Sequence, residues 1–163
     1  MSIEICKFQR SYIGEMTEIW NEVVRDAAAF PQDSELDAAQ AEEFFASQSF
    51  TGAAVDSESG EVAGLYILHP NNVGRCGHIC NASYAVKKTM RGRHIGEQLV
   101  RHSLAKGAEL GFRILQFNAV TASNTGAQAL YERLGFIRVG MIPEGFRRAD
   151  GTFDDIYIYY YKL

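Results

Sequence analysis

The order of hydrophobic periodicities is the feature of this 163-residue chain that most limits its possible folds. Apolar residues recur at helical spacing behind Ser11 and within residues 36–47, 95–108 and 127–134, which predicts four amphipathic helices. Segments that are apolar or alternate with period two, and so predict strands, lie at residues 3–8, 50–55, 62–68, 78–86, 113–120, 136–142 and 153–161. This order is not a strict alternation. It predicts a single α/β domain over residues 1–163, with a mixed sheet of about seven strands flanked by about four helices.

Composition excludes several classes of protein. With 47% hydrophobic and 22% charged residues, the chain resembles a soluble globular domain rather than a disordered one. It has no apolar run near the ~20 residues that cross a bilayer, and its first residues lack the basic-then-apolar layout of a signal peptide. The chain has three cysteines, Cys6, Cys76 and Cys80. This small, odd number argues against a disulfide framework. We therefore expect a cytoplasmic protein with no membrane partner.

The charges of the chain are divided unevenly. The net charge of −4 disfavours nucleic acid as a partner. Residues 1–63 hold 13 acidic and three basic side chains, whereas residues 64–163 hold seven acidic and 13 basic ones. A polyanionic ligand would be steered to the second part of the chain. The same asymmetry is compatible with a scatter of solvated faces, so motifs must decide between the two interpretations.

A predicted strand, a basic glycine-containing loop and a predicted helix follow one another between Ser83 and Gly96. The N-terminus of a helix presents unpaired N–H groups and the positive end of the helix dipole, and glycine lets a ligand approach the backbone. The arrangement predicts a site for a pyrophosphate group, although it is neither a Walker A sequence nor a G-x-G-x-x-G loop. The loop residues predicted to form this site are Lys87, Lys88, Arg91, Gly92, Arg93, His94, Ile95 and Gly96.

A second motif follows one predicted strand later. It contains Asn124 and the run Ala129-Leu130-Tyr131-Glu132-Arg133-Leu134-Gly135-Phe136. In this order and at this spacing, the two motifs resemble the GNAT superfamily of acyl-CoA-dependent N-acyltransferases, and most of all its phosphinothricin-acetyltransferase-like members. The loop departs from the family pattern at one position, where His94 replaces a glycine.

The resemblance implies a GNAT-like fold, acetyl-CoA as cosubstrate, no metal, and a role for each matching residue. The basic loop would hold the pyrophosphate, and the backbone of Tyr84, Ala85 and Val86 would hold the thioester and pantetheine. Asn124 would hydrogen-bond the pantetheine arm. Tyr131 would protonate the departing thiolate, because a thiolate must be protonated or stabilised as it leaves. The alternative for Tyr131 is a core aromatic residue, because its spacing also fits the apolar face of its helix.

The acceptor side of the site is less well determined by the sequence. The relatives that the chain most resembles carry a glutamate in the fourth strand, where this chain has Asn81, which cannot act as a base. His78 lies in the same predicted strand, but at the rise of an extended chain it is ~26 Å from Val86. We therefore expect the amine to lose its proton through water. Phe30 and Asn81 are predicted to contact the acceptor.

The predicted activity is the transfer of acetyl from acetyl-CoA to a primary amine of a small molecule by direct attack. The resemblance suggests an amino acid or an amino-acid-like xenobiotic as this acceptor. Two alternatives stay open: acetylation of a protein N-terminus or lysine, and a regulatory protein that binds CoA without turnover. The intact Tyr131 and Asn124 argue against the second alternative.

Two further clusters admit other interpretations. The segment Cys76-Gly77-His78-Ile79-Cys80, with His69 nearby, has the residue types of a zinc site. Its spacing is loose and no second cysteine pair exists, so we predict buried thiols and no metal. Residues 145–151 are predicted to form a hairpin loop whose arginines are either solvated or line the mouth of the substrate site.

The aromatic run near the C-terminus comprises Tyr157, Tyr159, Tyr160 and Tyr161. Such a run could stack on bases, but the net charge and the strand pattern favour a packed sheet or a subunit contact. We predict that this last strand is an exposed apolar edge and that the protein forms a homodimer through it.

Overall fold

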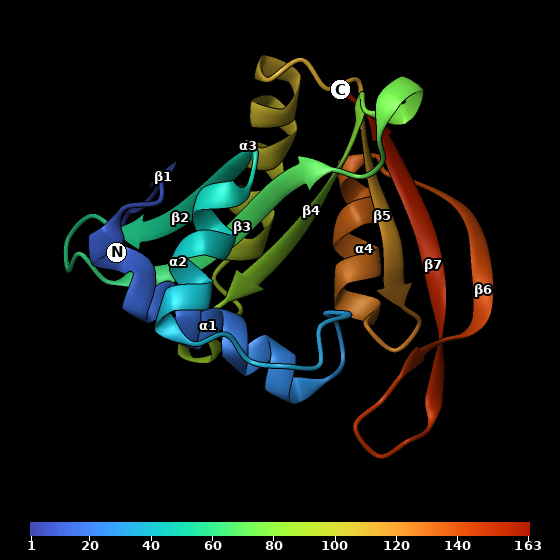
Figure 1. The fold of residues 1–163 in the computed structure, drawn as a ribbon, viewed down its shortest axis with the longest axis horizontal. Helices are drawn as coiled ribbons and strands as arrows, with labels where there is room; N and C mark the ends of the chain where they lie inside the picture. Colours follow the sequence, from blue (N-terminus) through green and yellow to red (C-terminus); the bar gives the residue numbers. More distant parts are fainter.

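The computed structural model describes residues 1–163 and contains one mixed sheet with four α-helices (Figure 1). The sheet order is β1-β2-β3-β4-β5-β7-β6, and every neighbouring pair is antiparallel except β4 and β5, which are parallel. This confirms the predicted fold class and element order. The strands are β1 (Ile3–Lys7), β2 (Phe50–Asp56), β3 (Val62–Pro70), β4 (Ile79–Val86), β5 (Ile114–Thr121), β6 (Ile137–Arg147) and β7 (Phe153–Lys162). The helices are α1 (Ile13–Asp26), α2 (Ala38–Ser47), α3 (Ile95–Glu109) and α4 (Thr125–Leu134).

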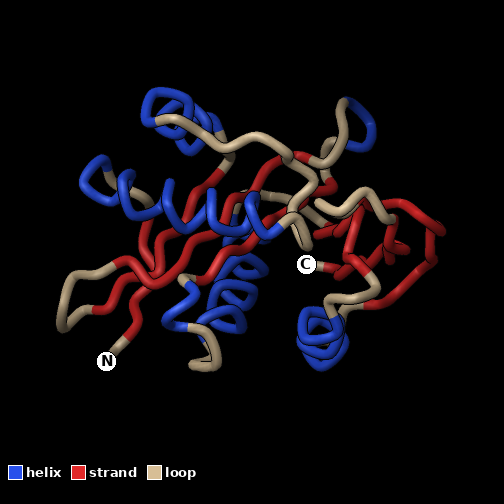
Figure 2. Tube along the Cα trace, turned by 90° about the horizontal axis from the view of Figure 1, so that it is seen from below, coloured by secondary structure: helices blue, strands red, loops and turns tan.

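Helices cover both faces of the sheet (Figure 2). The apolar stripe of α1, which includes Met16, Trp20 and Val24, packs with α2 on one face. Helix α3 packs through Ile95 and Leu99 on the other face, and α4 adds partly buried residues to the same cluster. Strand β3 lies between the two layers, and its residues 62–68 are all buried. This explains why its sequence is an almost continuous apolar run rather than an alternating one.

The two central parallel strands separate along their length. β4 and β5 pair only at Ile79↔Ile114 and Cys80↔Leu115, whereas β4 stays paired to β3 as far as Val86. Figure 1 shows the two strands diverging from this short contact. The backbone of β4 from residue 82 onwards therefore has one edge without a neighbouring strand, and this gap positions the candidate site.

The first helix begins one residue later than an N-cap at Ser11 would place it. Ser11 lies in a 3₁₀ turn, Arg10–Tyr12, and α1 begins at Ile13 with no side-chain cap. The apolar stripe of the helix packs on the sheet without such a cap. The second helix does carry a cap, because Asp37 and Gln40 form a capping box.

The predicted ends of the C-terminal hairpin are also wrong. β6 continues to Arg147, so Gly145 lies within the strand and the connecting loop is shorter than residues 145–151. The register shifts between Ile142 and Phe146, and a side chain at position 145 would come within 2.4 Å of Ile156. A bulge at a glycine lets the strand continue past this close contact.

The tyrosine-rich last strand is not at the edge of the sheet, so the prediction that it is an exposed edge strand is wrong. β7 pairs with β5 on one side and with β6 on the other, and β6 is the outer strand. The long apolar residues of β6 are exposed instead: Ile137, Val139, Met141 and Ile142 have exposed fractions of 47–57%.

No helix in the structure combines the length and the apolar character needed to span a membrane. The structure also brings no three histidine, cysteine, aspartate or glutamate residues into a group that could hold a metal ion. Of the two cysteines considered for zinc, Cys80 is buried, which raises its thiol pKa to about 12, and Cys76 is exposed.

Candidate functional site

Two cavities meet where β4 and β5 separate. The first, here called the splay cavity, has a volume of about 620 Å³ and is lined by β3, β4, β5, α4 and the segment after α1. The second, the loop cavity, has a volume of about 750 Å³ and lies between the end of β4 and the beginnings of α3 and α4. The two share the lining residues Ala29, Tyr84, Asn124 and Ala127. The two cavities are therefore neighbours with a shared wall.

The loop cavity is built on the N-terminus of α3. The chain reaches this helix through Gly92 at φ +78° and His94 at φ +59°, and α3 then begins at Ile95 with no side-chain cap. The first N–H groups of a helix have no partner within it, so those of Ile95 and Gly96 are available to a ligand. His94 adopts the left-handed conformation that a glycine would adopt. A residue with a Cβ atom thus occupies a backbone conformation that glycine adopts more readily.

Some of the charged residues around this loop line the cavity, and others form ion pairs outside its lining. Arg91 lines the loop cavity, and Arg133 of α4 lines it as well. Lys87 is ion-paired with Glu61, and this hydrogen bond raises the lysine pKa. Lys88 pairs with Asp26 at 2.8 Å. Three of the residues predicted to bind the pyrophosphate line neither cavity: Lys87, Lys88 and Arg93.

The remaining residues predicted for cofactor binding surround the loop cavity. They are Tyr84, Ala85, Val86, Arg91, Gly92, His94, Ile95, Gly96 and Asn124. Sequence reasoning missed Arg133, whose guanidinium lies 2.6 Å from the Glu97 carboxylate of α3. No spacing rule in the second motif distinguishes this arginine from an ordinary solvated one.

The free edge of β4 presents backbone donors to the gap. The Lys87 N–H donates to the Ala63 carbonyl at 2.9 Å. In an antiparallel ladder only alternate residues bond to a given neighbour, so Ala85 bonds to β3 and the N–H groups of Tyr84 and Val86 point away from it. Because β5 has diverged, these amides face the space between the strands. They suit an extended ligand that runs along the strand.

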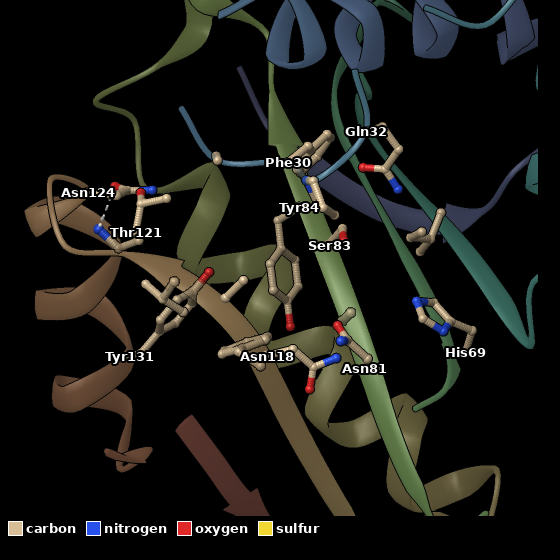
Figure 3. A pocket seen from close by; sticks show the side chains of 18 of the residues that line it. Phe30, Gln32, His69, Asn81, Ser83, Tyr84, Asn118, Thr121, Asn124 and Tyr131 are labelled. Atoms are coloured by element: carbon tan, nitrogen blue, oxygen red, sulfur yellow. Dashed lines mark hydrogen bonds between the residues drawn. The ribbon is translucent and has the colours of Figure 1, made fainter. Parts of the chain in front are cut away.

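Tyr131 enters the splay cavity from α4 (Figure 3). Its ring packs on Phe117 and Phe136, with centroid distances of 4.4 and 5.4 Å. Burial raises the pKa of the phenol well above its usual value, so the hydroxyl keeps its proton at neutral pH. A protonated hydroxyl at a cavity wall is a potential proton donor.

The other tyrosine of the cavity, Tyr84, has its hydroxyl occupied. The Ser103 hydroxyl donates to the Val100 carbonyl at 2.8 Å, so it accepts from the Tyr84 hydroxyl at 2.7 Å. Burial raises the Tyr84 pKa as well. Its hydroxyl is thus held by α3, and the group that Tyr84 offers to the gap is its backbone amide.

Asn124 lies at the junction of the cavities and caps α4. Its side-chain oxygen accepts from the Ala127 N–H at 3.2 Å, the bond drawn in Figure 3. The amide nitrogen of the side chain makes no hydrogen bond within the chain. The residue therefore stabilises the helix with one end and offers a donor with the other.

The predicted acceptor contacts, Phe30 and Asn81, both line the splay cavity. The Phe30 ring packs on Trp20 at a centroid distance of 4.3 Å. The Asn81 amide donates to the Asn71 side-chain oxygen at 3.2 Å, and Asn118 donates to the same oxygen at 2.6 Å. Sequence reasoning missed Asn118, because nothing in the pattern of β5 showed that this strand leaves its neighbour.

The splay cavity contains no fully charged side chain. Its lining has no aspartate, glutamate, lysine or arginine, and its polar members are neutral amides and hydroxyls together with one histidine, His69. This histidine, at the end of β3, is also one that sequence reasoning did not assign to the site.

Comparisons with known proteins identify similar sequences and structures. The model of the Acetyltransferase (GNAT) family matches residues 15–136. The N-acetyltransferase aca1 of Schizosaccharomyces pombe is 29% identical, and the alignment covers 96% of this chain and 83% of that protein. A GCN5-related N-acetyltransferase from Kribbella flavida superposes with a TM-score of 0.90 at 28% identity, over 99% of this chain and 98% of that one.

A second solved structure shares the fold at lower identity. It is a phosphinothricin acetyltransferase from Sinorhizobium meliloti in complex with acetyl-CoA, with a TM-score of 0.91 and 20% identity. The match covers 100% of this chain and 89% of that one.

Proposed function

Because this chain belongs to the Acetyltransferase (GNAT) family, we propose that it transfers the acetyl group of acetyl-CoA to the primary amine of a small molecule by direct attack. The observation that carries the proposal is the junction of the two cavities at Tyr84, Asn124 and Ala127. A long ligand that fills the loop cavity would place one end in the splay cavity, where a second molecule can meet it. Holding two reactants in one space accelerates their reaction.

The loop cavity suits the pyrophosphate and pantetheine of acetyl-CoA. The unpaired amides of Ile95 and Gly96, together with Arg91, provide donors and positive charge for the pyrophosphate. The free amides of Tyr84 and Val86 lie along the path of the pantetheine, and Asn124 offers its side-chain amide there. The acetyl group would then lie where β4 and β5 separate.

Tyr131 is the proton donor in this proposal. When the amine nitrogen bonds to the thioester carbonyl carbon and the carbon–sulfur bond breaks, the sulfur leaves as a thiolate. The Tyr131 hydroxyl lines the splay cavity and is protonated at neutral pH, so it can supply the proton that turns the thiolate into a thiol. Packing of its ring on Phe117 fixes its direction.

The lining of the splay cavity favours a small acceptor with little charge beyond its amine. No acidic side chain is present to hold a second ammonium group, and an unpaired buried charge is costly. Polyamines and lysine-rich peptides are therefore poor candidates. A volume of about 620 Å³, with Phe30 and Phe44 in the wall, suits a compact molecule with an apolar part.

The test is the release of free thiol from acetyl-CoA over a panel of amines. The panel contains amino acids, cyclic and linear alkylamines, a polyamine, and peptides with free N-termini or lysines. We expect turnover with at least one small monoamine and none above background with the polyamine or lysine peptide. Turnover with peptides alone would favour protein acetylation. A melting-temperature rise with acetyl-CoA but no thiol release with any amine would favour a binding protein without turnover.

We also propose that the protein forms a homodimer, through β6 rather than β7. β6 is the outer strand, and exposed apolar strand edges invite pairing with another copy.

A further inference from the structure

The amine that attacks a thioester must first lose a proton, and the splay cavity offers few groups to take it. Its lining contains three titratable side chains, His69, Tyr84 and Tyr131. Both phenols have raised pKa values and are protonated at neutral pH, and Tyr84 is already bonded to Ser103. Asn81 is an amide and accepts no proton. His69 is therefore the one side chain in the cavity lining whose neutral form offers a basic ring nitrogen.

The position of His69 follows from the pairing of β3 with β4. His69 lies opposite Asn81 in the antiparallel register, so the two side chains project from the same face of the sheet. Both line the splay cavity. Figure 3 shows the His69 ring pointing into the cavity from the side opposite Tyr131. A molecule in the cavity thus has the imidazole on one side and the phenol on the other.

The hydrogen bond of the ring determines which nitrogen is free. His69 Nδ1 lies 3.0 Å from the carbonyl oxygen of Pro70. A carbonyl oxygen only accepts hydrogen bonds, so Nδ1 must carry the proton in the neutral ring. The other nitrogen, Nε2, then has its lone pair unprotonated and has no partner within the chain. The bond to the backbone therefore leaves Nε2 as the basic nitrogen of the neutral ring.

We propose that His69 is the general base of the transfer, an inference that rests on the proposed function of the same site. Nε2 takes one proton from the ammonium form of the acceptor, and the neutral amine nitrogen forms a bond to the thioester carbonyl carbon. The carbon–sulfur bond breaks, and the sulfur takes the Tyr131 proton. The second proton lost by the nitrogen restores Tyr131, and the His69 imidazolium releases its proton to water. The products are the amide, CoA thiol and one proton.

The first experiment compares the wild-type protein with the His69→Gln variant on two kinds of nucleophile. One is the best alkylamine of the panel, which is largely protonated at pH 7.5, and the other is hydroxylamine, which is largely neutral there. With the alkylamine, kcat/KM should fall by about 100-fold or more, whereas the rate with hydroxylamine, corrected for the uncatalysed reaction, should change by less than about 5-fold because no base is needed. The KM for acetyl-CoA should not change.

The matched control is His78→Gln. His78 is an exposed histidine that lines neither cavity, so its loss should leave both rates unchanged. Free imidazole should restore part of the alkylamine activity of His69→Ala. Equal losses with both nucleophiles, or full alkylamine activity in His69→Gln, would overturn the base role. Failure of the wild-type protein with every amine is a different result, because it contradicts the proposed function itself.

A second measurement needs no turnover. Long-range ¹H–¹⁵N correlation spectra of the protein labelled on its histidines report which ring nitrogen carries the proton. We expect the neutral ring of His69 to be protonated at Nδ1 and free at Nε2. A proton found on Nε2 would overturn the assignment whatever the activity of the protein.

Discussion

At the scale of single residues, Tyr131 is both a packed ring and a free hydroxyl, and the two parts can be tested separately. Tyr131→Phe keeps the ring contacts with Phe117 and Phe136 and removes only the proton donor. We expect kcat to fall by about 10²–10³-fold, with unchanged KM for acetyl-CoA and unchanged melting temperature. Steady-state kinetics and thermal unfolding of one purified variant measure all three. Wild-type turnover would leave Tyr131 as a core aromatic residue only.

A second residue-scale prediction concerns the strained backbone at His94. This residue has a φ of +59° at the start of α3, a conformation that costs a residue with a Cβ atom about 1 kcal/mol. Glycine avoids that cost, so His94→Gly should have a larger free energy of unfolding than His94→Ala by about 1 kcal/mol. Denaturant unfolding of the two variants gives the difference. Equal stabilities would show that the loop relaxes out of this conformation in solution.

At the scale of elements, the loop before α3 should bind acetyl-CoA through Arg91 and not through its neighbour Arg93. Arg91 lines the loop cavity, whereas Arg93 lies outside it and reaches Met1 Sδ at 3.3 Å. Arg91→Glu should raise the KM for acetyl-CoA by about 10-fold or more, since it reverses a charge that would bond to phosphate. Arg93→Glu is the matched control and should change the KM far less. Equal effects would indicate long-range steering by net charge.

The elements themselves could be predicted from the sequence because each one carries its own periodicity. The seven strands and four helices follow from apolar spacing within 5–15 residues, which is a local property. The basic loop and the second motif are local as well, and the family resemblance that they carry is what points to Arg91, Asn124 and Tyr131. Lys87 and Lys88 line neither cavity, and their ion-pair partners are Glu61 and Asp26. These partners lie in other segments of the chain, so the sequence of the loop alone does not indicate the ion pairs.

The relations between elements could not be predicted in the same way. His69 reaches the site only because β3 pairs with β4 in one particular register, and no periodicity specifies a register between two strands. The separation of β4 from β5 is the absence of a pairing, which has no signature in either strand. The insertion of β7 between β5 and β6 likewise depends on tertiary packing, so the last strand in sequence was wrongly expected to be the last in the sheet.

At the scale of the whole molecule, the exposed apolar residues of β6 predict self-association. Val139 has an exposed fraction of 57% on this outer strand. We expect a dimer at micromolar concentration in sedimentation analysis, and a shift towards monomer in Val139→Glu, because a buried unpaired charge at an interface is unfavourable. Val73→Glu is the control, since Val73 is 82% exposed in a loop far along the chain from β6. A wild-type monomer would contradict the proposal.

The sheet has two parts, β1–β4 and β5–β7, which are joined only by two ladder pairs, Ile79↔Ile114 and Cys80↔Leu115. An extended ligand along β4 would occupy the position of the missing neighbouring strand and would connect the two parts. Amide hydrogen exchange should record this residue by residue. The N–H groups of Tyr84 and Val86 should exchange readily in the free protein and become protected when acetyl-CoA binds. Ala85, already bonded to β3, should be protected in both states. Binding of the cosubstrate would therefore increase the protection of alternate amides along β4.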